Sequence, residues 1–185
     1  LLLAPLAHPG PARAHDVPPD IALSAFVRIQ PEEVVLLVRV PLVLLGTLDL
    51  PLRGPGWLDL DRMGPAIEQA GAVVGRALLL ADAETPLPQR FRHGRISLPS
   101  DRSFDTATAA LAHIRGPPLP ATETVIATQG FFDAEYVVAA PAPIGALTLL
   151  VALPPGLADR LRLGLRLELP DGTVRPFEIR GAEAS

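Results

Sequence analysis

The longest apolar stretch of the chain, residues 34–52, limits the folds that it can adopt. It is long enough to cross a membrane, yet Arg39 and Pro41 lie near its middle and Gly46 and Asp49 follow. A charge at the bilayer centre costs about 3 kcal/mol on insertion scales, and a proline removes a helix hydrogen bond. We therefore expect two buried strands joined at Pro41 rather than a membrane helix.

Alternating apolar and polar residues predict strands through most of the chain. Residues 21–30 alternate with period two and residues 34–40 return after a turn, which predicts a hairpin. Residues 162–169 and 173–180 flank the tight-turn signal Pro170-Asp171-Gly172 and predict a second hairpin. The other strand candidates are residues 77–81 and 90–98, expected to pair with each other, and residues 124–128, 131–139 and 147–153.

Two helices are expected between these strands. Residues 104–115 have apolar positions at helical spacing, with Ser103 as the expected N-cap and Gly116 as the expected left-handed residue after the helix. A shorter helix is expected to end near residue 70. The sequence therefore predicts a mainly β fold, an antiparallel Ig-like β-sandwich with one or two short helical insertions.

The composition excludes several classes of site. The 185 residues include no cysteine and no lysine, so all 16 basic residues are arginine. A disulfide scaffold, a thiolate metal site, a cysteine nucleophile and a catalytic or phosphate-binding lysine are therefore excluded. A net charge of −4 lacks the basic footprint of a nucleic-acid binder. We also find no catalytic sequence motif, so we predict no catalytic residues and no enzyme activity.

The first 14 residues have the pattern that ends a signal peptide. A leucine-rich run leads to Ala12-Arg13-Ala14, which fits an A-x-A cleavage site. We expect residues 1–14 to be a truncated signal peptide and the mature domain, residues 15–181, to be extracytoplasmic, in the periplasm. The alternative is a disordered N-terminus of a cytosolic protein.

Histidines are the candidate metal ligands of this chain. His15 would begin the mature chain, where its α-amine and imidazole together could chelate Cu(II) or Ni(II). Asp16, His93 and His113 are candidates to complete such a site. The alternative is that His15 follows the cleavage site without binding a metal.

Basic residues gather between positions 90 and 102. Arg90, Arg92, Arg95 and Arg102 accompany His93 in this segment. Such a cluster could contact anionic lipid headgroups or an acidic partner. The alternative is a solvated strand edge whose charges oppose aggregation.

The segment Arg95–Phe104, RISLPSDRSF, is the most distinctive motif of the chain. Weaker segments accompany it: His15–Pro18, Leu37–Leu42, Pro51–Leu60, Ala110–His113, Gly116–Pro120, Gln129–Asp133 and Phe177–Glu178. Together they cover most of residues 15–181 and resemble the N-terminal extracytoplasmic domain of HupE/UreJ-type membrane proteins.

This resemblance implies an exported domain followed by a multi-helix membrane region, with residues 182–185 beginning the linker. It also implies a link to nickel or other transition metals. The family's own His/Asp metal motif belongs to the membrane helices and has no counterpart here. We therefore expect a non-catalytic, membrane-anchored accessory domain whose partners are the membrane portion of the same protein and a metal ion. The alternative is a free-standing periplasmic Cu/Ni-binding module that uses His15.

Overall fold

The fold is described from a computed structural model, which describes residues 20–139, 146–153 and 155–180. The expected signal peptide (1–14), the candidate ligands His15 and Asp16, and the expected linker (182–185) lie outside these residues. The described part is mainly β, as the sequence predicts, with two sheets and a few short helices.

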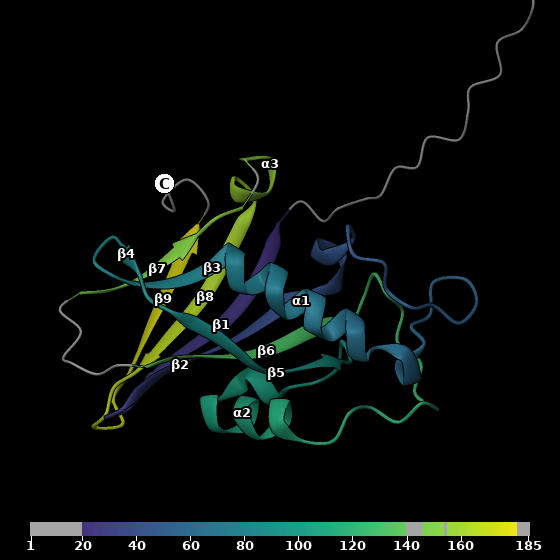
Figure 1. Cartoon of the computed structure of the whole chain (residues 1–185), viewed down its shortest axis with the longest axis horizontal. Helices are drawn as coiled ribbons and strands as arrows, with labels where there is room; N and C mark the ends of the chain where they lie inside the picture. The colour runs from purple at the N-terminus through teal and green to yellow at the C-terminus, as the bar shows by residue number, and fades with distance from the viewer. Residues whose placement is uncertain (1–19, 140–145, 154, 181–185) are drawn as a thin grey trace, which may run out of the picture.

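The larger sheet has six strands in the order β5-β6-β2-β1-β8-β9 (Figure 1). The two expected hairpins, β1–β2 and β8–β9, are both confirmed as antiparallel pairs. The bounds of the six strands are β1 Ile21–Ile29, β2 Glu33–Pro41, β5 Gln89–Ser97, β6 Phe131–Ala139, β8 Leu161–Glu168 and β9 Val174–Arg180.

The smaller sheet has three strands in the order β4-β3-β7. Its strands are β3 (Leu78–Asp82), β4 (Thr85–Pro86) and β7 (Leu147–Val151). The helices are α1 (Gly64–Ala77), α2 (Ala107–Arg115) and the short α3 (Pro155–Ala158), and three 3-10 turns are η1 (Leu42–Leu45), η2 (Leu60–Arg62) and η3 (Ser103–Asp105).

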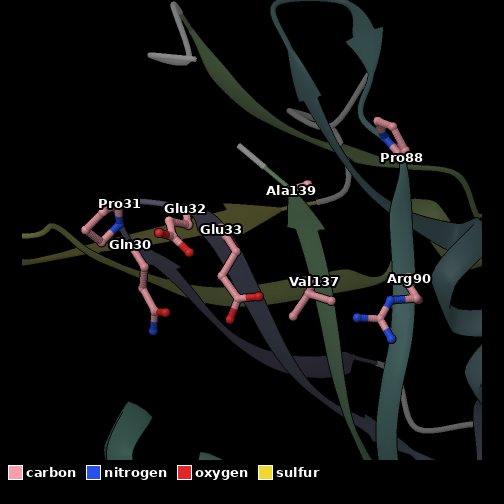
Figure 2. A pocket seen from close by; sticks show the side chains of 8 residues that line it. All are labelled: Gln30, Pro31, Glu32, Glu33, Pro88, Arg90, Val137 and Ala139. Carbon is pink, nitrogen blue, oxygen red and sulfur yellow. The ribbon is translucent and has the colours of Figure 1, made fainter. Parts of the chain in front are cut away.

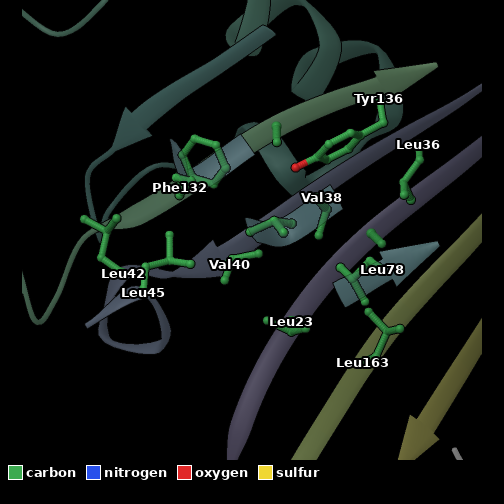
Figure 3. Close-up of a cluster of buried hydrophobic side chains, with 14 of the residues drawn as sticks. Leu23, Leu36, Val38, Val40, Leu42, Leu45, Leu78, Phe132, Tyr136 and Leu163 are labelled. Carbon is green, nitrogen blue, oxygen red and sulfur yellow. The ribbon is translucent and has the colours of Figure 1, made fainter. Parts of the chain in front are cut away.

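Both faces of the larger sheet are covered near its centre. Helix α1 and the smaller sheet pack on one face, where they share a core with β1, β2, β6 and β8 (Figure 3). Helix α2 packs on the other face against Phe26, Val35 and Leu37. Since the centre of β2 is buried on both sides, residues 34–38 form a continuous apolar run rather than an alternating one.

The expected antiparallel pairing is wrong for one strand pair. Strand β8 runs parallel to β1, from Ile21 beside Leu161 to Arg28 beside Glu168. A parallel neighbour requires a long crossover connection, and here that connection holds most of the chain. The larger sheet is therefore mixed.

The expected pairing of residues 77–81 with 90–98 is also wrong. Strand β3 pairs with β4 and β7, whereas β5 joins β6 in the other sheet. The side chain of Gln89 donates to the Leu78 carbonyl and accepts from the Leu80 N–H. This contact keeps the start of β5 beside β3, and the two strands then belong to different sheets.

Helix α2 ends at Arg115 as expected but starts later than the sequence suggests. Ser103 lies in η3, and Thr106 is the N-cap because its hydroxyl accepts from the Ala109 N–H at 3.2 Å. Gly116 has a φ of −72°, so the helix does not end on a left-handed residue.

Helix α1 approaches the larger sheet closely at Gly71. A Cβ at this position would lie 2.7 Å from the Phe91 ring, which is itself packed against Phe132 and Tyr136. Replacing a helical glycine by alanine ordinarily stabilises a helix by about 1 kcal/mol. We expect Gly71→Ala instead to destabilise the fold by about 1–2 kcal/mol, because the added methyl overpacks this contact.

Urea unfolding checks this prediction, with Gly64→Ala as the matched control. Gly64 belongs to the same helix, and a Cβ there meets no atom within 4 Å. The control should be neutral or stabilising. A gain in stability for Gly71→Ala similar to that of the control would contradict the close approach of α1.

Candidate functional site

The most concentrated polar chemistry of the described residues lies on the α2 face of the larger sheet. Arg39 of β2 and Asp133 of β6 stand directly opposite each other in the strand register. The Nε and Nη2 atoms of Arg39 donate to the two carboxylate oxygens of Asp133 at 2.8 and 2.6 Å. Asp133 is fully buried and Arg39 is only 7% exposed. This bidentate pair is the centre of a cluster that we call the α2-face network, which consists of Arg39, Ser97, Asp101, His113 and Asp133.

The loop after β5 adds a second carboxylate to the network. Asp101 accepts from Arg39 Nη2 at 2.7 Å and from both the N–H and the hydroxyl of Ser103. Partial burial opposes ionisation of Asp101. The hydrogen bonds from Arg39 and Ser103, together with nearby His113, outweigh it and lower its pKa to about 2. Phe104 and Phe131 lie against the Arg39 guanidinium, 4.4 and 5.2 Å from ring centre to Cζ.

Ser97, His113 and Asp101 lie in an order that resembles a hydrolase triad. Ser97 Oγ is 2.7 Å from His113 Nε2, and His113 Nδ1 is 3.3 Å from Asp101 Oδ2. However, the Ser97 hydroxyl donates to Asp133 at 2.6 Å, so His113 Nε2 must supply the proton of the 2.7 Å contact. In that arrangement His113 cannot take the proton of Ser97, and the serine side chain is fully buried.

Asp101, His113 and Asp133 are also the described residues whose geometry comes nearest to a metal site. Their ligand atoms lie within 4.8 Å of one another. Both carboxylates are already bonded to Arg39. Burial lowers the pKa of His113, and the nearby positive charge of Arg95 lowers it further. Two guanidinium groups oppose a divalent cation, and Cu(II) or Ni(II) would find only one imidazole here. These residues therefore do not fit a nickel or copper centre.

Acid should weaken the α2-face network through Asp101. The folded pKa of about 2 lies below the ordinary aspartate value of about 3.9. A depressed pKa contributes stability that is present above the unfolded value and lost as the pH falls through the folded one. We expect about 2 kcal/mol of unfolding free energy to be lost between about pH 4 and pH 2. Urea unfolding at each pH checks this, and Asp101→Asn should flatten that part of the profile. An equally steep profile in the variant would contradict it.

A second cluster surrounds Glu135, two residues further along β6. This fully buried carboxylate accepts from Arg115 of α2 at 2.9 and 2.6 Å and lies 3.0 Å from His93 Nδ1. Arg92 contributes a longer contact of 3.3 Å and also bonds Glu33. Burial opposes ionisation of Glu135, but Arg115 and His93 lower its pKa below the ordinary value.

A β-bulge explains why two consecutive residues of β5 reach the same carboxylate. The register between β5 and β6 shifts between Phe91 and His93. Phe91 faces the α1 core. Arg92 is the extra residue of the bulge, so Arg92 and His93 both point to the opposite face, where each contacts Glu135.

The two candidate histidines in the described part of the chain are not brought together. His93 belongs to the Glu135 cluster and is exposed, whereas His113 belongs to the α2-face network. His93 is not among the three groups whose ligand atoms gather within 4.8 Å.

The four candidate contact arginines divide between buried and exposed positions. Arg95 is 8% exposed and donates to the His113 carbonyl at 2.6 Å, and burial lowers its pKa. Arg92 is half-buried in the Glu135 cluster. Arg102 is exposed and pairs with Asp105. Arg90 is exposed and lines a cavity of about 620 Å³, across which it faces the Gln30–Glu33 turn (Figure 2). An anionic lipid headgroup or an acidic protein would therefore contact Arg90 and Arg102 without breaking a buried ion pair.

Sequence reasoning missed Arg39, Asp133 and Glu135 as site residues. The signal was present, because each is a charged residue inside an otherwise apolar strand. Their burial depends on α2, which covers that face of the sheet, and the pattern of residues in the strands does not predict that a helix packs there.

Comparison with known proteins gives no family assignment. No protein-family model matches the chain, and no curated protein matches it at a significant level. Within the described residues, none of the helices is both long and apolar enough to cross a membrane.

Proposed function

We propose that this chain is a non-catalytic extracytoplasmic accessory domain of a HupE/UreJ-like membrane protein, linked to transition-metal handling. Its partner is the membrane portion of the same protein, to which it is anchored. Its role is to contact that portion or to present a ligand to it. The resemblance of its sequence motifs to that family is the starting point of the proposal.

The observation that carries the proposal is that the separate motifs meet in one place. Arg39, Ser97, Asp101, His113 and Asp133 come from four of the segments that carry the resemblance, and all belong to the α2-face network. The distinctive motif and three of the weaker ones are therefore parts of a single, largely buried arrangement. That arrangement satisfies its own hydrogen bonds, which supports a structural role for the motifs and a domain without catalysis.

We also propose that the two sheets form an Ig-like sandwich in their packing, although the larger one is mixed. Leu78 and Leu80 of the smaller sheet share a core with Leu23 and Leu163 of the larger one. Facing sheets with a common apolar layer are the feature of a sandwich.

Removing the domain from the complete protein tests the proposal. Cells would express the complete gene with or without the segment for residues 20–180, and cellular nickel would be measured by mass spectrometry. We expect the membrane portion to insert in both cases and nickel accumulation to fall to background without the domain. Unchanged accumulation, with the membrane portion present at equal amount, would contradict a role in metal handling.

A free-standing metal module is the second candidate, favoured by His15 after the expected cleavage site. Calorimetric titration of residues 15–181 with Cu(II) and Ni(II) separates the two proposals. Binding that is lost in His15→Ala would support the module. Absence of binding by the domain, together with domain-dependent nickel accumulation, would support the accessory role.

A further inference from the structure

A second region of the molecule has the character of a ligand site. An apolar cavity of about 310 Å³ lies between the two sheets, where α1 ends and β3 begins. Its walls include Leu23 of β1, Val74 of α1, Leu78 of β3, and Leu153 and Leu157 from the segment after β7. Small-molecule sites are concave, mostly apolar and provided with few polar groups. This cavity lies on the opposite face of the larger sheet from the α2-face network.

The polar side chains that line the cavity are Thr47 and Arg76. Both are exposed, so they lie at its opening. No hydrogen bond or ion pair joins the Arg76 side chain to another described residue, in contrast to the arginines of the α2 face. The opening therefore presents a cation beside an apolar interior.

A second apolar cavity of about 310 Å³ continues along the same strands. The first cavity touches Leu23 and the second Val27, which point to the same face of β1. In the same way Leu78 lines the first and Leu80 the second on β3. Ala25 is the residue of β1 between them on this face, and its side chain is small. Figure 3 shows Leu23, Leu78 and Leu163 gathered in this part of the core.

We propose that this region binds a single-chain anionic amphiphile, a fatty carboxylate, with its tail between the sheets. The carboxylate would pair with the Arg76 guanidinium at the opening. The apolar walls recognise the tail, the cation selects an anionic head over a cationic one, and the alignment of the two cavities suits an elongated ligand. The proposal does not depend on the accessory role, because it uses none of the residues of the α2-face network.

Dodecanoate and dodecylamine are the probes that test it, since they share a tail and differ in head charge. Ala152→Trp blocks the opening, because Ala152 is an exposed lining residue, and Thr47→Trp blocks it from another side. Arg76→Glu reverses the charge. The matched controls are Ala109→Trp on the exposed side of α2 and Arg62→Glu on η2, neither of which lines the cavity. Circular dichroism establishes that each variant is folded.

We expect saturable binding of one dodecanoate per chain by calorimetry, with weaker binding of dodecylamine. A blocking variant should reduce dodecanoate affinity at least about tenfold, and Arg76→Glu about fivefold, whereas the controls keep it. If Ala152→Trp fails to fold, Thr47→Trp provides the same comparison. Absence of saturable dodecanoate binding, or binding unchanged in both folded blocking variants, would overturn the site. Equal affinity for both probes together with no effect of Arg76→Glu would overturn the proposed head-group recognition.

Discussion

Asp133→Ala should lower the free energy of unfolding by about 3–5 kcal/mol. Asp133 is fully buried and accepts both the bidentate Arg39 bonds and the Ser97 hydroxyl. Its removal leaves the buried guanidinium with Asp101 as its remaining carboxylate partner. Asp101 is half-buried and accepts from Arg39 through a single carboxylate oxygen, so it compensates only part of the lost bidentate pairing, and this is the largest effect that we expect from a single polar substitution. Urea unfolding followed by circular dichroism measures it.

Two comparisons keep this result specific to the network. Asp105→Ala removes an exposed carboxylate whose pairing with Arg102 is solvated, so it should change stability by less than about 1 kcal/mol. The double variant Arg39→Met/Asp133→Ala should be less destabilised than the sum of its two single variants by about 2 kcal/mol. Additive effects, or equal losses for Asp105→Ala and Asp133→Ala, would argue against a coupled buried pair.

Glu135→Ala should lower the free energy of unfolding by about 2–3 kcal/mol. The loss is smaller than for Asp133 because the cations around Glu135 can turn towards water. Arg115 and His93 have side chains that are 41% and 47% exposed, whereas Glu135 itself is fully buried. The substitution also removes an ion pair between α2 and β6.

Glu33→Ala is the matched control for this cluster. Glu33 pairs with Arg92 but its side chain is 29% exposed, so its loss should cost less than about 1 kcal/mol. Hydrogen exchange should show faster exchange of α2 amides in Glu135→Ala than in Glu33→Ala. The same stability and the same α2 protection in both variants would show that Glu135 does not hold the helix.

Local patterns predicted much of the fold. Period-two alternation located both hairpins, and β6 spans residues 131–139 as expected. The end of α2 at Arg115 follows from the glycine and proline that come next in the sequence. These features depend on neighbouring residues, whose effect on the backbone can be judged within a short window.

Long-range pairing could not be predicted in the same way. The parallel contact of β1 with β8 joins segments about 140 residues apart. The alternation of apolar and polar residues in either strand would be equally compatible with pairing to a different strand. The bulge at Arg92 depends on how β5 fits against β6. The sequence did not reveal the Arg39–Asp133 pair for the same reason, because these two residues are opposite each other only once β2 and β6 are paired.

Protease treatment of spheroplasts that make the complete protein tests whether the domain is extracytoplasmic and membrane-anchored, and an antibody raised against residues 20–180 detects it. We expect the antigen to sediment with the membrane, and we expect external protease to degrade it while a cytoplasmic marker survives. Recovery of the antigen in the soluble periplasmic fraction, or its protection from protease until the spheroplasts are lysed, would contradict an anchored extracytoplasmic domain.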